Sequence, residues 1–298
     1  MMRILLLGKD GQLGQDMQPK LAVQGELVCC GRDTLDLENT DSIRQMVRQV
    51  QPSIIVNAAA YTVVDQAENE PDRAIAINGT APAILAEEAQ QLGAALLHVS
   101  TDYVFDGQKN TPYLEEDIPH PVGAYGQSKW LGEKRIQQSC DRHVILRTAW
   151  VYGVGGKGNF VKTMLRLGAD REELRVVVDQ VGSPTWTGDL AGAIAQFIPH
   201  LCPGTGTQRP ITGIYHFTNS GAISWYDFAV AIFEEAERLG FPLRLQRVVP
   251  ITTAEYPTLA SRPAYSVLSN KKTSALLGGP APHWRQGLRQ MLKQLTAT

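Results

Sequence analysis

Short apolar runs alternate with helical stretches along the first 220 residues of the chain. Arg3–Leu7 (RILLL) and Glu26–Cys30 (ELVCC) are almost continuously apolar, which is typical of strands buried on both faces. Similar runs occupy residues 53–60, 94–100, 143–148, 174–179 and 213–218. Helical periodicity separates them over residues 12–24, 40–50, 71–92, 125–139, 189–198 and 225–239, with Thr40 or Asp41 and later Ser224 as expected N-caps. This alternation predicts an α/β fold with a doubly wound parallel sheet, because each strand returns through a right-handed helical crossover.

The pattern breaks in two places. Residues 103–124 form a segment of about 20 residues with several prolines, and a loop of that length inside a compact domain is usually functional. From Phe241 onward the chain is again rich in proline and is predicted to be irregular. Because the composition changes near Trp150, we expect a smaller mixed α/β unit from there on, with residues 173–219 returning to the first sheet.

Composition narrows the classes of protein. The 298 residues carry 28 Lys and Arg against 30 Asp and Glu, so nothing attracts nucleic acid or an anionic membrane. No apolar stretch approaches the roughly 20 residues that span a bilayer, and no signal-peptide pattern opens the chain. Neither the six histidines nor the four cysteines have the spacing of metal ligands, so no metal is predicted. The cysteines, which favour a reducing compartment and hence a cytoplasmic protein, are Cys29, Cys30, Cys140 and Cys202.

Three glycines, Gly8, Gly11 and Gly14, follow the first predicted strand and open the first predicted helix. Glycines at such a turn let the backbone approach a pyrophosphate, which then rests on the helix N-terminus. Arg32 and Asp33 stand at the end of the second predicted strand. An acidic residue there binds a ribose 2′-hydroxyl, whereas an Arg accommodates a 2′-phosphate. We therefore predict a dinucleotide-binding domain over residues 1–149, preferring NADP(H) with NAD(H) also accepted, and a substrate-binding domain over residues 150–298.

Candidate catalytic groups follow the fourth predicted strand. Thr101 lies within Ser100-Thr101-Asp102, at the carboxyl end of that strand, where open α/β sheets bind ligands. Tyr125 and Lys129 are four residues apart and so share one face of the next predicted helix. A lysine ammonium beside the phenol would lower the phenol pKa from about 10 and make Tyr125 a usable acid or base. These residues predict proton exchange with a carbonyl/alcohol pair, with a hydroxyl to hold the substrate oxygen.

At these residues the chain resembles the dTDP-4-dehydrorhamnose reductases of the extended short-chain dehydrogenase/reductase family. The matching runs are GKDGQLG (8–14), NAAAYTVVDQAE (57–68), AINGTAP (76–82), STDYVFDG (100–107), PVGAYGQSKWLGE (121–133), RTAWVYG (147–153), GNFVKTMLRL (158–167) and QVGSPTWTGDLA (180–191). The resemblance covers most of residues 1–220 and has a weaker match at residues 261–263. It implies a Rossmann-like first domain.

The resemblance also implies an activity and a role for each matching position. The activity is NAD(P)H-dependent reduction of the 4-keto group of dTDP-6-deoxy-L-lyxo-4-hexulose (dTDP-4-dehydro-L-rhamnose) to dTDP-L-rhamnose, with Tyr125 as proton donor. Lys129 would bind the nicotinamide ribose and lower the pKa of Tyr125. Besides Gly8, Gly14 and Arg32, the residues placed against the cofactor are Gly11, Gln12 and Leu13 at the pyrophosphate, Asp36 and Leu37 at the adenine, and Ala59, Tyr61 and Thr62 at the nicotinamide. Thr101, Asp102 and Trp150 match substrate-contacting positions.

Other activities remain open at this point. Another nucleotide-sugar 4-keto reductase or an epimerase of the same extended family would share these motifs. A dehydratase is disfavoured, because Tyr103 stands where a second carboxylate would be needed after Asp102. A non-catalytic NADP(H)-binding regulatory subunit, as in one relative of this group, is the alternative from a different class. Some relatives are dimers bridged by Mg²⁺, so the resemblance allows a homodimer, although Asp189 gives no specific match to a bridging ligand.

Overall fold

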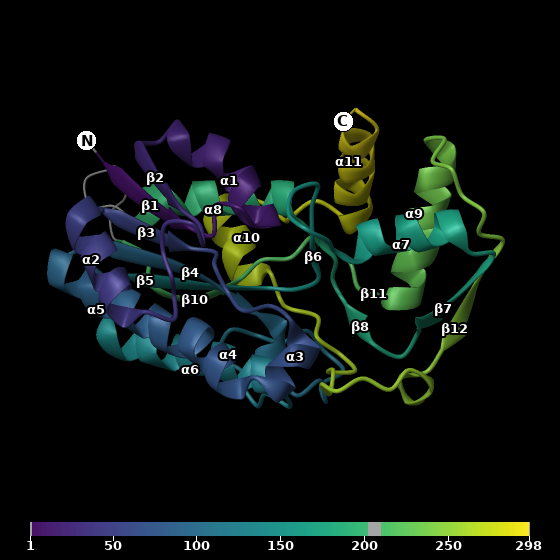
Figure 1. The fold of residues 1–298 in the computed structure, drawn as a ribbon, viewed down its shortest axis with the longest axis horizontal. Coiled ribbons are helices and arrows are strands. Elements are labelled where there is room, and N and C mark those ends of the chain that lie inside the picture. The colour runs from purple at the N-terminus through teal and green to yellow at the C-terminus, as the bar shows by residue number, and fades with distance from the viewer. Residues whose placement is uncertain (1, 202–209, 298) are drawn as a thin grey trace.

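The computed structural model describes residues 2–201 and 210–297, so Cys202 lies outside the described residues (Figure 1). A central sheet of six parallel strands has the order β10-β5-β4-β3-β1-β2. The strands are β1 (Arg3–Leu7), β2 (Glu26–Cys30), β3 (Ile54–Asn57), β4 (Ala95–Thr101), β5 (His143–Thr148) and β10 (Gly213–His216). The predicted doubly wound parallel sheet is confirmed.

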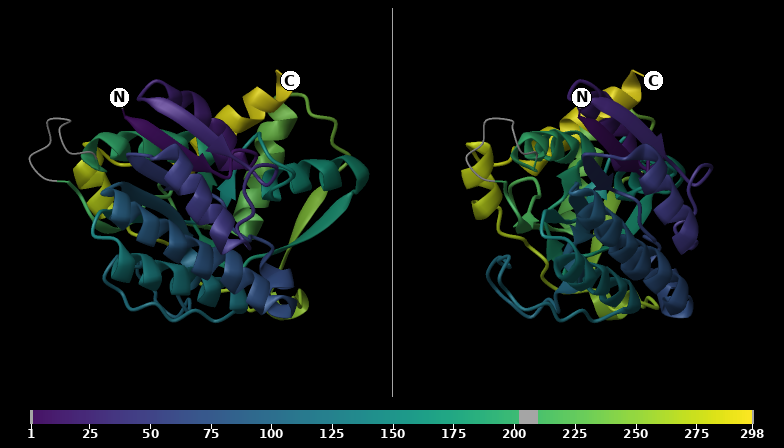
Figure 2. Two further views of the ribbon diagram at one scale, coloured as in Figure 1. Left: turned by 60° about the vertical axis from the view of Figure 1, so that its left-hand side comes forward. Right: turned by 90° about the vertical axis from the view of Figure 1, so that its left-hand side faces the viewer.

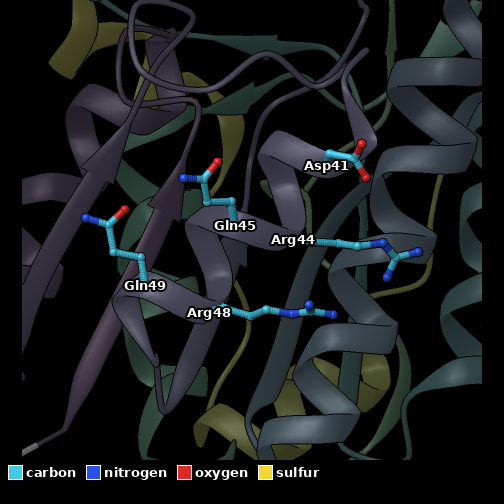
Figure 3. A pocket seen from close by; sticks show the side chains of 5 residues that line it. All are labelled: Asp41, Arg44, Gln45, Arg48 and Gln49. Carbon is cyan, nitrogen blue, oxygen red and sulfur yellow. The ribbon is translucent and has the colours of Figure 1, made fainter.

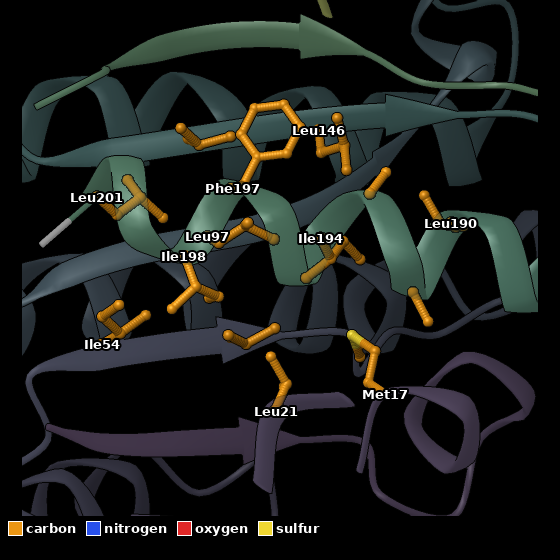
Figure 4. Packing of buried hydrophobic residues seen from close by; sticks show 14 of the residues in the cluster. Met17, Leu21, Ile54, Leu97, Leu146, Leu190, Ile194, Phe197, Ile198 and Leu201 are labelled. Carbon is orange, nitrogen blue, oxygen red and sulfur yellow. The ribbon is translucent and has the colours of Figure 1, made fainter. Parts of the chain in front are cut away.

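Helices cover both faces of this sheet (Figures 1 and 2). One face packs against α1 (Gln12–Ala22) and α8 (Thr187–Leu201), and the other against α2 (Thr40–Val50), α5 (Ala81–Leu92) and α6 (Ala124–Ser139). Figure 4 shows the apolar side of α8 lying over the strands, with Ile194 and Phe197 directed at them. The sequence of β1 is continuously apolar because the strand is buried on both faces. Ile4 and Leu6 belong to one core, and Leu5 and Leu7 belong to the other.

Two predicted helices differ from expectation. The N-cap of α2 is Asn39, whose Oδ1 accepts from the Ser42 N–H at 3.1 Å, and neither Thr40 nor Asp41 has that role. The predicted 71–92 helix is divided into α4 (Pro71–Ile75), a π-helical turn η1 (Ala76–Thr80) and α5. Pro82 lacks the N–H that would bond to the Asn78 carbonyl in a continuous helix. That carbonyl instead faces Gly132 of α6, where a Cβ would overlap it.

Several of the remaining elements form a third apolar cluster beside the carboxyl edge of the sheet (Figure 1). Its helices are α7 (Phe160–Asp170), α9 (Trp225–Arg238) and α11 (Trp284–Thr296). Three two-stranded sheets accompany them: β6 (Val151–Tyr152) with β9 (Thr185–Trp186), β8 (Val181–Gly182) with β11 (Ile223–Ser224), and β7 (Glu173–Val177) with β12 (Arg247–Ile251). The shorter elements are α3 (Val64–Asn69), the 3-10 turns η2 (Asp102–Val104) and η3 (Thr253–Glu255), and α10 (Lys271–Leu277).

Two expectations for this half are wrong. The chain does not return to the central sheet at residue 173, because β7 pairs with β12; only α8 and β10 make that return. The region after Phe241 is not irregular throughout, because it supplies β12, α10 and α11. Sequence patterning missed them because β12 and α10 are short and depend on packing against distant segments. The division into domains at residues 149 and 150 stays a prediction.

Candidate active site

The glycine turn lies where the strand order of the sheet reverses. β2 and β3 flank β1 on opposite sides, so the carboxyl ends of β1 and β3 form the switch point at which open α/β sheets bind ligands in a crevice. Gly8 directly follows β1 and has a φ of +89°, and a Cβ there would lie 2.9 Å from the Ala59 N. Only glycine therefore satisfies both this left-handed backbone and the close approach to the segment after β3.

The turn leads directly into α1. Gly11 is the N-cap and makes no side-chain hydrogen bond to the helix, and a Cβ on Gly14 would overlap the Gly8 carbonyl oxygen. The first backbone N–H groups of α1, including those of Gln12 and Leu13, have no intrahelical acceptor, which makes this N-terminus suited to a pyrophosphate. The Leu13 side chain is buried in the core, so Leu13 can offer only its backbone.

Gln12 also joins the turn to the second half of the chain. Its Nε2 donates to the Val151 carbonyl at 3.1 Å, and its Oε1 accepts from Asn159 Nδ2 at 3.1 Å. The segment after β6 therefore lies beside the predicted pyrophosphate site. Sequence reasoning did not assign Asn159 a role.

Charged side chains gather at the end of β2. Arg32 is exposed, and Lys9 Nζ pairs with Asp33 Oδ2 at 2.8 Å. Asp36 uses Oδ1 to accept from the Glu38 N–H at 2.9 Å, and Leu37 is half-buried. This edge thus presents two cations and two carboxylates to the predicted adenine ribose, and Lys9 is a group that the motif analysis did not single out.

The segment after β3 is held by two asparagines. The Ala59 N–H donates to Asn57 Oδ1 at 3.1 Å, and the Tyr61 N–H donates to Asn78 Oδ1 at 2.8 Å. The Tyr61 hydroxyl donates to Glu70 at 3.0 Å, so it is directed to α3 and α4, whereas Thr62 is exposed. Both asparagines are buried, so they fix the backbone expected to face the nicotinamide.

Tyr125, Thr101 and Asp102 come together at the ends of β4 and α6. Thr101 Oγ1 donates to Asp102 Oδ1 at 3.1 Å, and the Thr101 hydroxyl lies close enough to the Tyr125 phenol to influence its pKa. Burial raises the pKa of Tyr125 to about 12, with the neighbouring Thr101 hydroxyl opposing the shift. Burial also raises the pKa of Asp102 to about 6, against the hydroxyls of Ser266 and Thr101. Within residues 2–201 and 210–297, no hydrogen-bond partner meets Asp102 Oδ2.

Lys129 does not lie as expected. Its Nζ donates to the Val99 carbonyl at 2.8 Å and is 3.0 Å from His98 Nε2, so the side chain is held against β4. The predicted lowering of the Tyr125 pKa by this ammonium is wrong for this structure, because desolvation acts on the phenol in the opposite direction. Burial also lowers the pKa of Lys129 to about 8, while Glu133 opposes that shift.

Trp150 has an unusual backbone. Its φ is +48°, a left-handed conformation that a bulky residue rarely adopts. The indole stacks on Trp225 with ring centroids 3.5 Å apart and an interplanar angle of 5°. Such strain is typical of functional sites, where surrounding packing holds it in place. Trp225 itself was hidden from sequence reasoning, because it sits in an ordinary amphipathic helix.

The segment around residues 261–266 closes the site from the far end of the chain. Arg262 Nη2 binds Asp65 Oδ2 at 2.8 Å, and the guanidinium lies close enough to the Tyr103 phenol for each group to influence the pKa of the other. Tyr103 lies edge-on to Tyr125, with centroids 5.5 Å apart. The weak sequence match at residues 261–263 was therefore the available signal for this contact.

The surface hollow in Figure 3 lies elsewhere, over α2. Its lining residues are Asp41, Arg44, Gln45, Arg48 and Gln49, and both arginines reach towards carboxylates of α5. In the described ranges no helix is long and apolar enough to cross a membrane, and no cluster of three or more potential metal ligands occurs. The expectation of no metal stays a prediction.

Comparisons with known proteins agree with this geometry. The dTDP-4-dehydrorhamnose reductase of Escherichia coli strain K12 is 43% identical over 306 aligned positions, covering 100% of this chain and 99% of that protein. The crystal structure of dTDP-4-dehydrorhamnose reductase from Bacillus anthracis, in complex with NADP, is 37% identical with a TM-score of 0.89 and covers 99% of this chain and 100% of that one. The Clostridium acetobutylicum enzyme structure is 38% identical with the same TM-score, over 99% of this chain and 100% of that one. The family model described as RmlD substrate binding domain matches residues 2–297, so the chain belongs to that family.

Proposed function

We propose that this chain is an NADPH-dependent oxidoreductase that reduces the 4-keto group of dTDP-4-dehydro-L-rhamnose to dTDP-L-rhamnose. Full-length similarity to dTDP-4-dehydrorhamnose reductases supports the substrate and the reaction. The observation that carries the proposal is the buried Tyr125 phenol beside the Thr101 hydroxyl at the carboxyl edge of the sheet. Such a pair can hold a substrate oxygen and deliver a proton to it.

The residues present fit a nicotinamide cofactor. Gly8 and Gly14 have no room for a Cβ, so the backbone at the head of α1 is open to a pyrophosphate. Arg32 and Lys9 are the cations that would meet a 2′-phosphate, which favours NADP(H) over NAD(H). When bound, this cofactor supplies the hydride. The Bacillus anthracis relative is a complex with NADP.

The chain's own residues handle the proton. A raised pKa keeps Tyr125 in its O–H form at neutral pH, as a donor to a developing alkoxide must be. The single hydrogen of the Thr101 hydroxyl is directed at Asp102 Oδ1 in this structure. When substrate binds, that hydrogen turns to the substrate oxygen, which Thr101 then holds beside Tyr125. Ser100 is not the polarising hydroxyl, since its Oγ donates to Glu133 at 2.5 Å on the opposite side of β4.

Further assignments belong to the same proposal. Lys129 binds the nicotinamide ribose, Gln12 and the Leu13 backbone face the pyrophosphate, and Asp36 and Leu37 flank the adenine. Trp150 and Asp102 contact the sugar nucleotide. A cytoplasmic location and a homodimer are also proposed, the first from composition and the second from the resemblance to dimeric relatives.

The deciding experiment mixes the purified chain, NADPH and enzymatically generated dTDP-4-dehydro-L-rhamnose. Nicotinamide absorbance and product chromatography are followed together. We expect one NADPH oxidised for each dTDP-L-rhamnose formed. NADPH binding with no oxidation would contradict the proposal and favour a regulatory NADP(H)-binding subunit. Oxidation only with a different keto sugar would assign the chain to another nucleotide-sugar reductase.

A further inference from the structure

A chain of buried hydrogen bonds runs from the predicted nicotinamide side of the crevice to the predicted catalytic lysine. The Ala59 N–H donates to Asn57 Oδ1 at 3.1 Å, Asn57 Nδ2 is 3.1 Å from His98 Nδ1, and His98 Nε2 is 3.0 Å from Lys129 Nζ. Asn57 and His98 are completely buried and Lys129 is 1% exposed. Bulk solvent therefore does not reach the side chains of Asn57, His98 and Lys129, whereas Ala59, at the crevice end, is half-buried.

The Ala59 N–H determines which group donates in each of the following hydrogen bonds. A backbone N–H can only donate, so the Asn57 oxygen faces Ala59 and the Asn57 amide hydrogens face His98. His98 must then accept at Nδ1. Burial lowers the pKa of His98 well below its usual value, so the ring is neutral and carries one hydrogen. That hydrogen is on Nε2, and it points at Lys129 Nζ.

We propose that His98 is a positioning residue for Lys129: its Nε2–H donates to a neutral Nζ amine, and Lys129 becomes charged only when the Asn57 amide turns and releases Ala59. This inference rests on the proposed reductase function for its biological meaning. In the neutral state Nζ accepts from His98 and donates one hydrogen to the Val99 carbonyl. In the charged state Nζ has three hydrogens and no lone pair, so His98 must accept at Nε2 and carry its hydrogen on Nδ1.

The two states differ by one proton and by one hydrogen bond at the crevice. With Nδ1–H directed at Asn57, the amide must present its oxygen to His98 and its hydrogens to the Ala59 N–H. The Ala59 N–H is then free to donate to a ligand, and Lys129 has a hydrogen to give to one. Protonation of Lys129 and release of the Ala59 N–H therefore occur together. One proton thus changes the hydrogen-bond donors at both ends of the predicted nicotinamide-ribose site.

The surrounding charges allow this equilibrium near neutral pH. Burial lowers the pKa of Lys129 to about 8, and the lost hydrogen bond at Ala59 lowers it further. Glu133 acts in the opposite direction, but Arg147 and Ser100 already occupy its oxygens. The other charged or titratable groups on α6 and on the elements packed against it are Tyr125, Lys134, Arg135, Asp102, Tyr103, His143, Asp65, Glu68, Asp72, Arg73, Glu87 and Glu88.

The test is an NMR titration of the full, cofactor-free chain between pH 6 and pH 10.5. It follows the Lys129 ¹³Cε resonance, assigned with Lys129→Met, and the Ala59 amide resonance. We expect Lys129 to titrate at or below about pH 8 and the Ala59 amide to shift with the same midpoint. A Lys129 midpoint near the ordinary 10.5, or an Ala59 amide that does not follow it, would overturn the proposal. The wild-type titration decides this even if no variant folds.

Two variants separate the two halves of the chain of bonds. His98→Gln places an amide oxygen near the position of Nε2, where it accepts from an ammonium, so the Lys129 midpoint should rise by about one unit, a tenfold gain in proton affinity. His98→Asn keeps a partner for Asn57 but not for Lys129, so the Ala59 amide should stop following Lys129. His143→Gln is the matched control, since His143 binds the Cys140 carbonyl away from Lys129. An unchanged midpoint in His98→Gln contradicts the proposal.

Measuring activity as well as titration distinguishes a failure of the His98 proposal from a failure of the proposed reductase function. In the reductase assay, the alkaline limb of kcat against pH should move upward in His98→Gln together with the Lys129 midpoint. A chain that shows the coupled titration but reduces no keto sugar would contradict the proposed function alone. A chain that reduces the sugar with no coupled titration would contradict the His98 proposal alone.

Discussion

Helix α6 carries two buried polar groupings one to two turns apart, and they are built on opposite principles. Glu133 is bound twice by the Arg147 guanidinium, with Nη2 to Oε2 at 2.7 Å and Nε to Oε1 at 3.0 Å, and also by Ser100. Arg147 lies 5.0 Å from the centroid of the Phe105 ring, and neither charged side chain is more than 1% exposed. Here every charge has a partner of opposite sign.

The grouping at the start of α6 is not matched in this way. Asp102 has one oxygen without a partner in the described part of the chain, and Lys129 is buried against a neutral histidine. The burial of these two groups is not compensated, so it shifts their pKa values. The pKa of Asp102 rises to about 6 and that of Lys129 falls to about 8. The comparison teaches that paired burial organises the fold, whereas unpaired burial at a crevice places groups near the pH where they exchange protons.

The largest expected effect is on stability and comes from removing one partner of the Glu133–Arg147 pair. Arg147→Met leaves the Glu133 carboxylate buried without its cation, which should lower the free energy of unfolding by about 3–5 kcal/mol. Chemical denaturation measures this loss. The double variant Glu133→Leu with Arg147→Met removes both charges and should lose less than the single variant. A loss under about 1 kcal/mol in Arg147→Met would show that this pair does not organise the core.

The next effect concerns the reacting group of the unpaired cluster. Tyr125→Phe removes the proton donor and should lower kcat by about 10²–10⁴-fold while NADPH affinity changes little. Steady-state kinetics and a nicotinamide fluorescence titration measure the two quantities. Tyr113→Phe is the matched control, because Tyr113 donates to Asp106 in a separate cluster. Near-normal turnover by Tyr125→Phe would remove Tyr125 from the mechanism.

The unpaired burial of Asp102 should appear in the pH dependence of the free energy of unfolding. Since its pKa rises from 3.8 to about 6 on folding, the folded chain keeps a proton that the unfolded chain loses between these values. The wild-type free energy of unfolding therefore falls as pH rises through this window, by about 3 kcal/mol in total from this residue. In Asp102→Asn that fall is absent, so the variant gains stability relative to wild type from about pH 4 to 6. Parallel stability curves for the two proteins would show that Asp102 is ionised normally.

The smallest effect lies at the exposed charges beside β2. Arg32→Ala should lower the preference for NADPH over NADH by about three- to tenfold, because an exposed cation contributes only about 1 kcal/mol. Lys9→Ala should act in the same direction, since a 2′-phosphate would compete with Asp33 for Lys9. The ratio of kcat/KM for the two cofactors measures both variants. Arg48→Ala on α2 is the surface control, and equal ratios in all of these proteins would exclude a cofactor-selective role for this edge.

Local sequence was sufficient for much of the site. Gly8, Gly11 and Gly14 lie at the turn between β1 and α1, and Tyr125 lies near Thr101, while the roles of all five residues stay predictions. The residues that it missed are His98 and Asn57, which are single polar positions inside apolar strands. Their partners are 31 and 41 residues away in the sequence, so no periodicity within a window could find them.

The sequence by itself determined the parallel sheet, the glycine turn and the order of the site residues, because strand burial, helix periodicity and backbone freedom are properties of short segments. Only the tertiary structure decided where Lys129 points, how β7 pairs and what closes the site at Arg262. Each of these depends on contacts between segments far apart in the chain. The pKa values of Tyr125 and Lys129 follow the same rule, since desolvation is set by everything packed around a side chain and not by its neighbours in sequence.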